Sequence, residues 1–116
     1  MRLSLPYPPS ANRYWRIFRG RATPSKAATE YKAVVRQSAC LGVITGPLAL
    51  SITLHPKQCK DGSESKVVID LDNCLKVALD ALQGVAYEND RQVKRITLAY
   101  GESMPDGGLT IVVDGV

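Results

Sequence analysis

The chain has 116 residues, of which 45% are hydrophobic and 22% charged, and these values are ordinary for one soluble globular domain. Its apolar runs fall well short of the ~20 residues that span a bilayer, and the proline-broken N-terminus lacks the apolar core of a signal peptide. We therefore expect one domain over residues 1–116, with no membrane partner and a cytoplasmic location.

The net charge of +4 conceals a strong asymmetry between the two halves of the chain. Residues 1–60 carry ten Lys or Arg and a single acid, Glu30, whereas residues 61–116 carry five Lys or Arg and ten acids. A basic half favours a polyanionic partner such as nucleic acid, and an acidic half offers ligands for a metal. The alternative is that any small soluble protein needs some net charge.

The cysteines and the histidine do not indicate a zinc site. The three cysteines, Cys40, Cys59 and Cys74, match no zinc-binding spacing, and His55 is the single histidine. A bound metal should therefore have oxygen ligands, which indicates Mg²⁺ or Mn²⁺.

The first 22 residues predict a short strand over residues 2–5, an extended proline-rich segment, and then an exposed loop or arm over residues 11–22. In the arm, arginines alternate with aromatic residues, which could neutralise phosphates and stack on unpaired bases. The alternative for Trp15 and Phe18 is a place in the core or in a dimer contact. The arm contains Arg13, Tyr14, Trp15, Arg16, Phe18, Arg19 and Arg21.

Helical spacing over residues 27–39 predicts a helix that is capped by Thr23 or Ser25 and stops near Gly42. Alternating apolar residues predict a half-buried strand over residues 48–54, and a polar loop follows from Lys57 to Lys66.

A second helix is predicted after the extended residues 67–69, with Asp72 as its N-cap and Gly84 as its stop. A turn over residues 87–91 and two strands, over residues 95–100 and 109–113, complete the chain. The resulting order, β-α-β-α-β-β, predicts a small α+β domain with a mixed sheet and two helices.

Acidic residues gather around the start of this second helix. Asp70 and Asp72 are two residues apart in an extended segment, so they point the same way, and Lys76 lies one helical turn after Asp72. Asp90 would complete the set if the turn after the helix folds back over the helix start. Each residue also has a plainer interpretation: Asp72 as a cap, Lys76 as a surface partner of Asp72 or Asp80, and Asp90 as a turn former.

Three motifs resemble the RusA family of Holliday junction resolvases over nearly the whole chain. They are LPYPPSANRY at residues 5–14, DLDNCLK at residues 70–76, and DRQV at residues 90–93. The chain departs from the family pattern at Ile69, where relatives often have Arg or Lys, and at Asn89, where they often have a second acid.

The resemblance implies a homodimer that nicks opposed strands of a four-way DNA junction in recombination and repair. Many members of the family are encoded by phages or prophages, which extends the expectation to a phage origin. It implies that Asp70, Asp72 and Asp90 bind the metal and that Lys76 is catalytic. Dimerisation rests on the resemblance, because no apolar stripe is obviously left over for it in the sequence.

We expect Mg²⁺, with Mn²⁺ as a substitute, to activate a water and stabilise charge on the scissile phosphate. The alternatives are a non-catalytic DNA-binding module, or a small structural protein in which Asp70 and Asp72 are only caps. The residues expected to contact DNA are Asn12, Arg13, Tyr14, Arg16, Arg19, Arg21 and Asn73.

Overall fold

A four-stranded mixed sheet organises the computed structural model, which describes residues 2–18, 20–38 and 42–115. Its outer strand β1 pairs antiparallel with β6, β6 pairs antiparallel with β4, and β4 runs parallel to the other outer strand, β5. All four predicted strands are therefore confirmed. Their bounds are β1 (Arg2–Leu5), β6 (Gly108–Gly115), β4 (Leu48–His55) and β5 (Val93–Tyr100).

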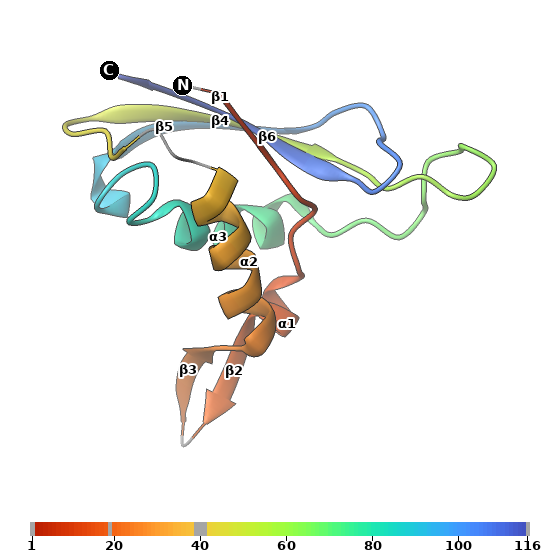
Figure 1. Ribbon diagram of the computed structural model, residues 1–116, viewed down its shortest axis with the longest axis horizontal. Helices are drawn as coiled ribbons and strands as arrows, with labels where there is room; N and C mark the ends of the chain where they lie inside the picture. Colours follow the sequence, from red (N-terminus) through yellow and green to blue (C-terminus); the bar gives the residue numbers. More distant parts are fainter. Residues whose placement is uncertain (1, 19, 39–41, 116) are drawn as a thin grey trace.

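Two helices, α2 (Lys26–Ser38) and α3 (Leu71–Leu82), lie side by side against one face of this sheet (Figure 1). Parallel neighbours such as β4 and β5 need a crossover connection, because a hairpin can join only antiparallel strands. Helix α3 lies on that connection. The predicted α+β domain with a mixed sheet and two helices is confirmed.

The core lies between the sheet and the two helices. Along β4, alternate side chains from Leu48 to Leu54 are at most 2% exposed, while the residues between them are half-buried. This follows from the two-residue period of a strand, which sends alternate side chains to the helix-covered face. Val35 of α2 and Val77 of α3 meet them from the other side, both fully buried.

The segment after the prolines is not the irregular arm that the sequence predicts. Helix α1 (Ala11–Tyr14) forms first, and β2 (Trp15–Phe18) and β3 (Arg21–Pro24) then pair as an antiparallel hairpin that points away from the sheet (Figure 1). The prediction failed because strands of four residues, each holding one arginine, are too short to show a clear period. Gly20, at φ +76°, lies between the two strands.

Ser25 caps α2, which confirms one of the two predicted caps. Its Oγ accepts a hydrogen bond from the backbone N–H of Ala28 at 3.2 Å, and its carbonyl accepts from that of Thr29 at 3.0 Å. The predicted end of this helix falls partly on residues 39–41, which lie outside the described part of the chain.

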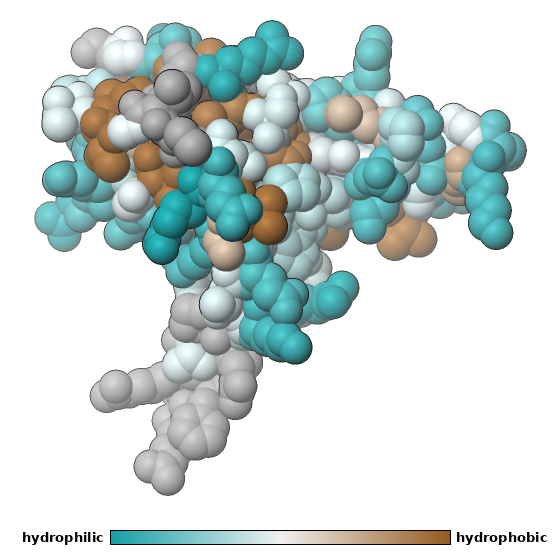
Figure 2. Space-filling view, viewed as in Figure 1, coloured by the Kyte–Doolittle hydropathy of each residue, from teal (hydrophilic) through white to brown (hydrophobic). Residues whose placement is uncertain are grey.

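The polar loop from Lys57 to Lys66 is confirmed, and it projects beyond the sheet as a surface of mostly hydrophilic side chains (Figures 1 and 2). Backbone hydrogen bonds between Cys59 and Ser63 close its tip, so the loop has a defined shape. None of the helices in the described ranges is long and apolar enough to cross a membrane.

Candidate active site

The start of α3 places two acids and a lysine at one end of the helix. Asp70, not the predicted Asp72, is the N-cap: its backbone is extended (φ −67°, ψ 152°) and its carbonyl accepts from the N–H of Cys74 at 3.0 Å. The predicted N-cap was wrong by two residues, because the helix begins at Leu71 and takes Asp72 into its first turn. Lys76 still follows Asp72 by about one turn, so the two side chains share a face of the helix.

Two tyrosines from distant parts of the chain hold the residue before Asp70. The hydroxyl of Tyr7 accepts a hydrogen bond from the Ile69 N–H, and the hydroxyl of Tyr100 donates to the Ile69 carbonyl, both at 3.0 Å. Sequence reasoning missed both residues, although Tyr7 lies in the proline-rich motif and Tyr100 ends a predicted strand. These two hydrogen bonds fix the backbone of Ile69 and therefore the position of Asp70.

The Tyr100 hydroxyl also reports the electrostatics of this end of α3. Desolvation raises the pKa of Tyr100, and the negative charge of Asp70 and, more weakly, that of Asp72 raise it further. Both carboxylates therefore act on the same small region of space. A cation placed there would be attracted by both.

Asp70, Asp72 and Lys76 are exposed, and within the described ranges none of them forms an ion pair. The predicted surface pair between Lys76 and Asp80 does not occur, because Asp80 pairs with Lys32 of α2 at 2.9 Å and accepts a hydrogen bond from the Tyr14 hydroxyl. The two acids and the lysine are thus left available for a ligand.

Asp90 lies at the opposite end of α3. It opens the 3₁₀ helix η1 (Asp90–Gln92), and the Gln83 amide, with its nitrogen turned toward Asp90, donates to the two carboxylate oxygens at 3.2 and 3.3 Å. Burial raises the pKa of Tyr87, and the negative charge of nearby Asp90 raises it further. Gln83 and Tyr87 both follow the last residue of α3, so Asp90 belongs to that end.

The length of α3 separates Asp90 from the other two acids. At about 1.5 Å per residue, its 12 residues span roughly 18 Å, whereas oxygens that bind one Mg²⁺ lie within about 4 Å of each other. Accordingly, no group of three acidic, His or Cys side chains suited to a metal occurs among the described residues. The turn does not fold back over the helix start.

Asn89 has a local role at this turn. Its side chain accepts from the Arg91 N–H at 2.9 Å, and the Gln92 side chain returns to the Asn89 N–H at 3.0 Å, which completes a capping box. The Gln92 amide also donates to the carbonyls of Ile44 and Gly46. Asp90 is therefore presented from a firmly anchored turn.

The residues predicted to contact DNA differ in their exposure to solvent. Arg13 is exposed and Asn73 is half-buried, so both can reach a ligand, whereas Tyr14 is fully buried and cannot stack on a base, which corrects that prediction. Trp15 is half-buried against the core, as its alternative interpretation expected. The side chains of Asn12, Arg16 and Arg21, and all of Arg19, lie outside the described residues.

An apolar strip, which the sequence did not reveal, runs between α3 and the edge strand β5. Leu71, Leu75 and Leu79 lie four residues apart on α3 and are only partly buried. On β5, Ile96 and Tyr100 remain 39% and 48% exposed although they point to the helix-covered face of the sheet. These five residues, named the α3–β5 strip below, connect the end of α3 that carries Asp70 with the end that carries Asp90.

Comparison with known proteins gives one consistent result. A family model described as endodeoxyribonuclease RusA matches residues 6–113. The crossover junction endodeoxyribonuclease RusA of Escherichia coli O139:H28 (strain E24377A / ETEC) is 33% identical over 96 residues, covering 78% of this chain and 73% of that protein. The enzyme of the same name from Enterobacteria phage HK97 is 35% identical over 114 residues, covering 94% of this chain and 89% of that protein.

Proposed function

Because the chain belongs to the RusA family of endodeoxyribonucleases, we propose that it resolves four-way DNA junctions at active sites that two copies of the chain build together. Each site would combine Asp70, Asp72 and Lys76 of one subunit with Asp90 of the other. The whole chain, residues 1–116, would form one endonuclease domain. It would act in the cytoplasm, in recombination and repair, and the relative from phage HK97 supports a phage origin.

The separation of Asp90 from the other acids is the observation that carries this proposal. In a two-fold symmetric dimer, residue i of one subunit faces residue j of the second, and j faces i in return. If two α3 helices pack antiparallel about such an axis, the Asp90 end of each meets the Asp70 end of the other. Two sites then form, roughly one helix length apart, and each can meet one strand of a junction.

The α3–β5 strip supports this arrangement. Its partly exposed leucines and Ile96 would be covered by the same strip of a second copy, and it lies between the two ends that must exchange. Covering apolar surface is the main favourable term in such an association. One edge of the molecule would thus provide both the contact and the completed sites.

The donor set suits a hard divalent cation. Asp70 and Asp72 are exposed carboxylates with no ion pair in the described ranges. Asp90 supplies the third carboxylate, which accepts hydrogen bonds from the Gln83 amide. Such oxygens fit Mg²⁺, with Mn²⁺ as a substitute. When bound, the cation would supply an activated water and a Lewis acid.

The protein's own residues would hold and orient the substrate. Lys76 extends from the same face of α3 as Asp72, and its ammonium can stabilise the negative charge that develops on the attacked phosphate. Arg13, Arg16, Arg19, Arg21, Asn12 and Asn73 would contact the DNA, the arginines through phosphates and therefore in a salt-dependent way.

Replacing Asp72 or Asp70 with Asn tests the site. Each variant should lose at least about 1000-fold in Mg²⁺-dependent nicking of a synthetic four-way junction, because a charged ligand to the cation is gone. Junction affinity should stay the same or rise, since a negative charge near the phosphates is removed.

The matched control is Asp106→Asn, an exposed acid in the turn before β6 that should cut normally. Full nicking by both Asp70→Asn and Asp72→Asn would remove the catalytic assignment. The same assay separates the second candidate, a non-catalytic DNA-binding module, which the basic first half of the chain favours. That module would bind equally with Mg²⁺ or EDTA and would nick nothing.

A further inference from the structure

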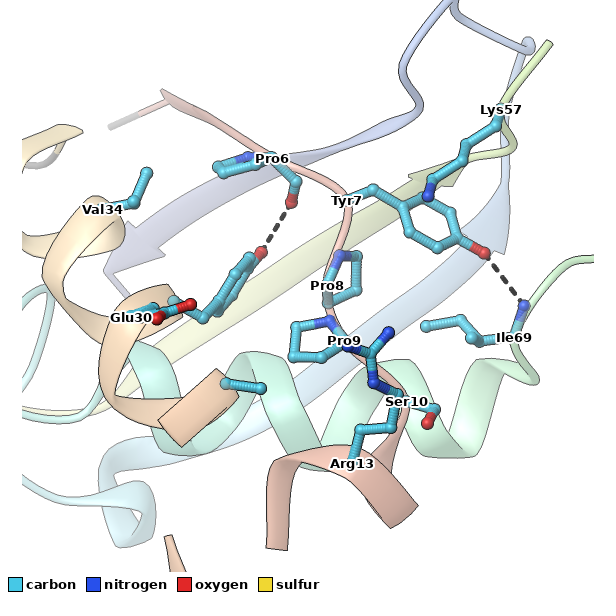
Figure 3. Close-up of a pocket in the computed structure, with 12 residues that line it drawn as sticks. Pro6, Tyr7, Pro8, Pro9, Ser10, Arg13, Glu30, Val34, Lys57 and Ile69 are labelled. Atoms are coloured by element: carbon cyan, nitrogen blue, oxygen red, sulfur yellow. Dashed lines mark hydrogen bonds between the residues drawn. The ribbon is translucent and has the colours of Figure 1, made fainter. Parts of the chain in front are cut away.

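A groove of about 440 Å³ opens beside the start of α3, between the proline-rich segment and α2 (Figure 3). Its volume falls in the range of pockets that hold small organic ligands. None of the four residues proposed for catalysis lines this groove.

The walls of the groove are flat, apolar and fixed in position. Pro9 lines one side and the exposed Val34 of α2 the other, while Pro8 and Tyr31, which also line the groove, are buried. The Tyr31 hydroxyl donates to the Pro6 carbonyl at 2.7 Å, so a hydrogen bond ties the two sides together across the groove (Figure 3). Proline rings add rigidity because they fix the backbone φ. The groove is therefore formed before any ligand arrives.

Among the described residues, two cationic side chains and one acidic side chain line the groove. Arg13 and Lys57 line it, and neither forms an ion pair in the part of the chain that the structure describes. The Lys57 ammonium lies 4.9 Å from the centre of the Tyr7 ring, which holds this cation at the groove by a cation–π contact. Glu30, the only acid among the first 60 residues, lies on the α2 side.

The groove is continuous with the candidate active site through Tyr7. The ring of Tyr7 lines the groove, while its hydroxyl accepts from the N–H of Ile69, the residue before Asp70 (Figure 3). A ligand in the groove would thus lie directly beside the phosphate that Asp70 and Asp72 address.

We propose that the groove holds one unstacked nucleotide of the strand being cut, next to the scissile phosphate; this rests on the proposed function. The phosphates on either side of the nucleotide meet Arg13 and Lys57, and the base lies against Pro9 and Val34. Glu30 on the α2 side is paired with Lys26 at 3.9 Å, and the nucleotide enters with its backbone toward Arg13 and Lys57. Neither a lone phosphate nor an intact duplex accounts for apolar walls of this size.

The test scans a four-way junction with single abasic sites around the cleavage point and measures affinity in EDTA, so that no strand is cut. In the wild type, removing the base that occupies the groove should weaken binding about tenfold, the value of one stacked base. Val34→Trp, which fills the groove from α2, should weaken binding to the intact junction by a similar factor and make it insensitive to that abasic site.

The matched control is Ala33→Trp, which adds the same side chain at the neighbouring, exposed position of α2 and should keep the wild-type pattern. If Val34→Trp does not fold, Ala27→Phe fills the same groove. A flat abasic scan in the wild type overturns the proposal. So does conversion of the Val34→Trp dimer to a monomer, which would make the groove an interface between copies.

The two proposals fail differently. Mg²⁺-dependent nicking of the intact junction by the wild type, together with a flat abasic scan, leaves the proposed function standing and removes the nucleotide site. A wild type that neither binds nor nicks the junction removes both.

Discussion

At the scale of single residues, tyrosine hydroxyls connect the elements that make up the site. All five tyrosines of the chain take part in a hydrogen bond to a residue at least eight positions away. Each bond joins two separate parts of the chain, and for the buried Tyr14, Tyr31 and Tyr87 it also offsets the cost of burying the hydroxyl. The partners are Ile69 for Tyr7 and Tyr100, Asp80 for Tyr14, Pro6 for Tyr31, and Leu79 for Tyr87.

Tyr14→Phe should destabilise the fold more than Tyr31→Phe. The Tyr14 hydroxyl donates to the carboxylate of Asp80, and hydrogen bonds to charged groups are worth ~1.5–3 kcal/mol, against ~0.5–1.5 kcal/mol for neutral ones such as Tyr31 to Pro6. Urea unfolding at pH 7 measures both variants, with the m value unchanged. A smaller loss of stability in Tyr14→Phe than in Tyr31→Phe would show that the Asp80 contact is unimportant.

The sequence could predict the local part of this chemistry but not the distant part. Asp72 and Lys76 share a face because four residues make about one helical turn, and that rule needs no tertiary structure. Tyr14 and Asp80 are 66 residues apart, so no periodicity links them. The sequence therefore indicates a DNA contact for Tyr14, where the fold instead buries it under α2 and α3.

At the scale of elements, α3 sets the distance between the acids that we assign to the active site. The helix begins between Asp70 and Asp72 and ends near the turn that holds Asp90. The α3–β5 strip runs along its length. The strip was not predictable, because Leu75, Leu79 and Ile96 look like ordinary core positions. Their partial exposure follows from β5 being an outer strand of the sheet, which only the strand order shows.

Ile96→Glu should convert the dimer to a monomer and abolish junction nicking, although Asp70, Asp72 and Asp90 are all retained. A charge in the α3–β5 strip would have to be buried without a partner at the interface. Sedimentation velocity and the nicking assay measure the two effects. Thr97→Glu, one residue along β5 and on the opposite face of the sheet, should stay dimeric and active. An active monomer of Ile96→Glu would contradict the shared site.

At the scale of the whole molecule, strand alternation and helical spacing were enough to predict an α+β domain with two helices on a mixed sheet. Those patterns are local, whereas the strand order, in which β4 and β5 run parallel as neighbours, could not be predicted from them. The proposed meeting of Asp90 with Asp70 and Asp72 does not follow from any local pattern. We infer that it depends on a second copy of the chain, and a single sequence cannot show which of its surfaces meets that copy.

Mixing two inactive variants, Asp72→Asn and Asp90→Asn, tests the shared site most directly. After subunit exchange, a mixed dimer has one doubly damaged site and one intact site, made of Asp70 and Asp72 from one subunit and Asp90 from the other. We predict that nicking of a four-way junction, absent in each variant alone, returns in the mixture. If each chain carried its own complete site, every site in the mixture would stay damaged, and continued inactivity after demonstrated exchange would contradict the account.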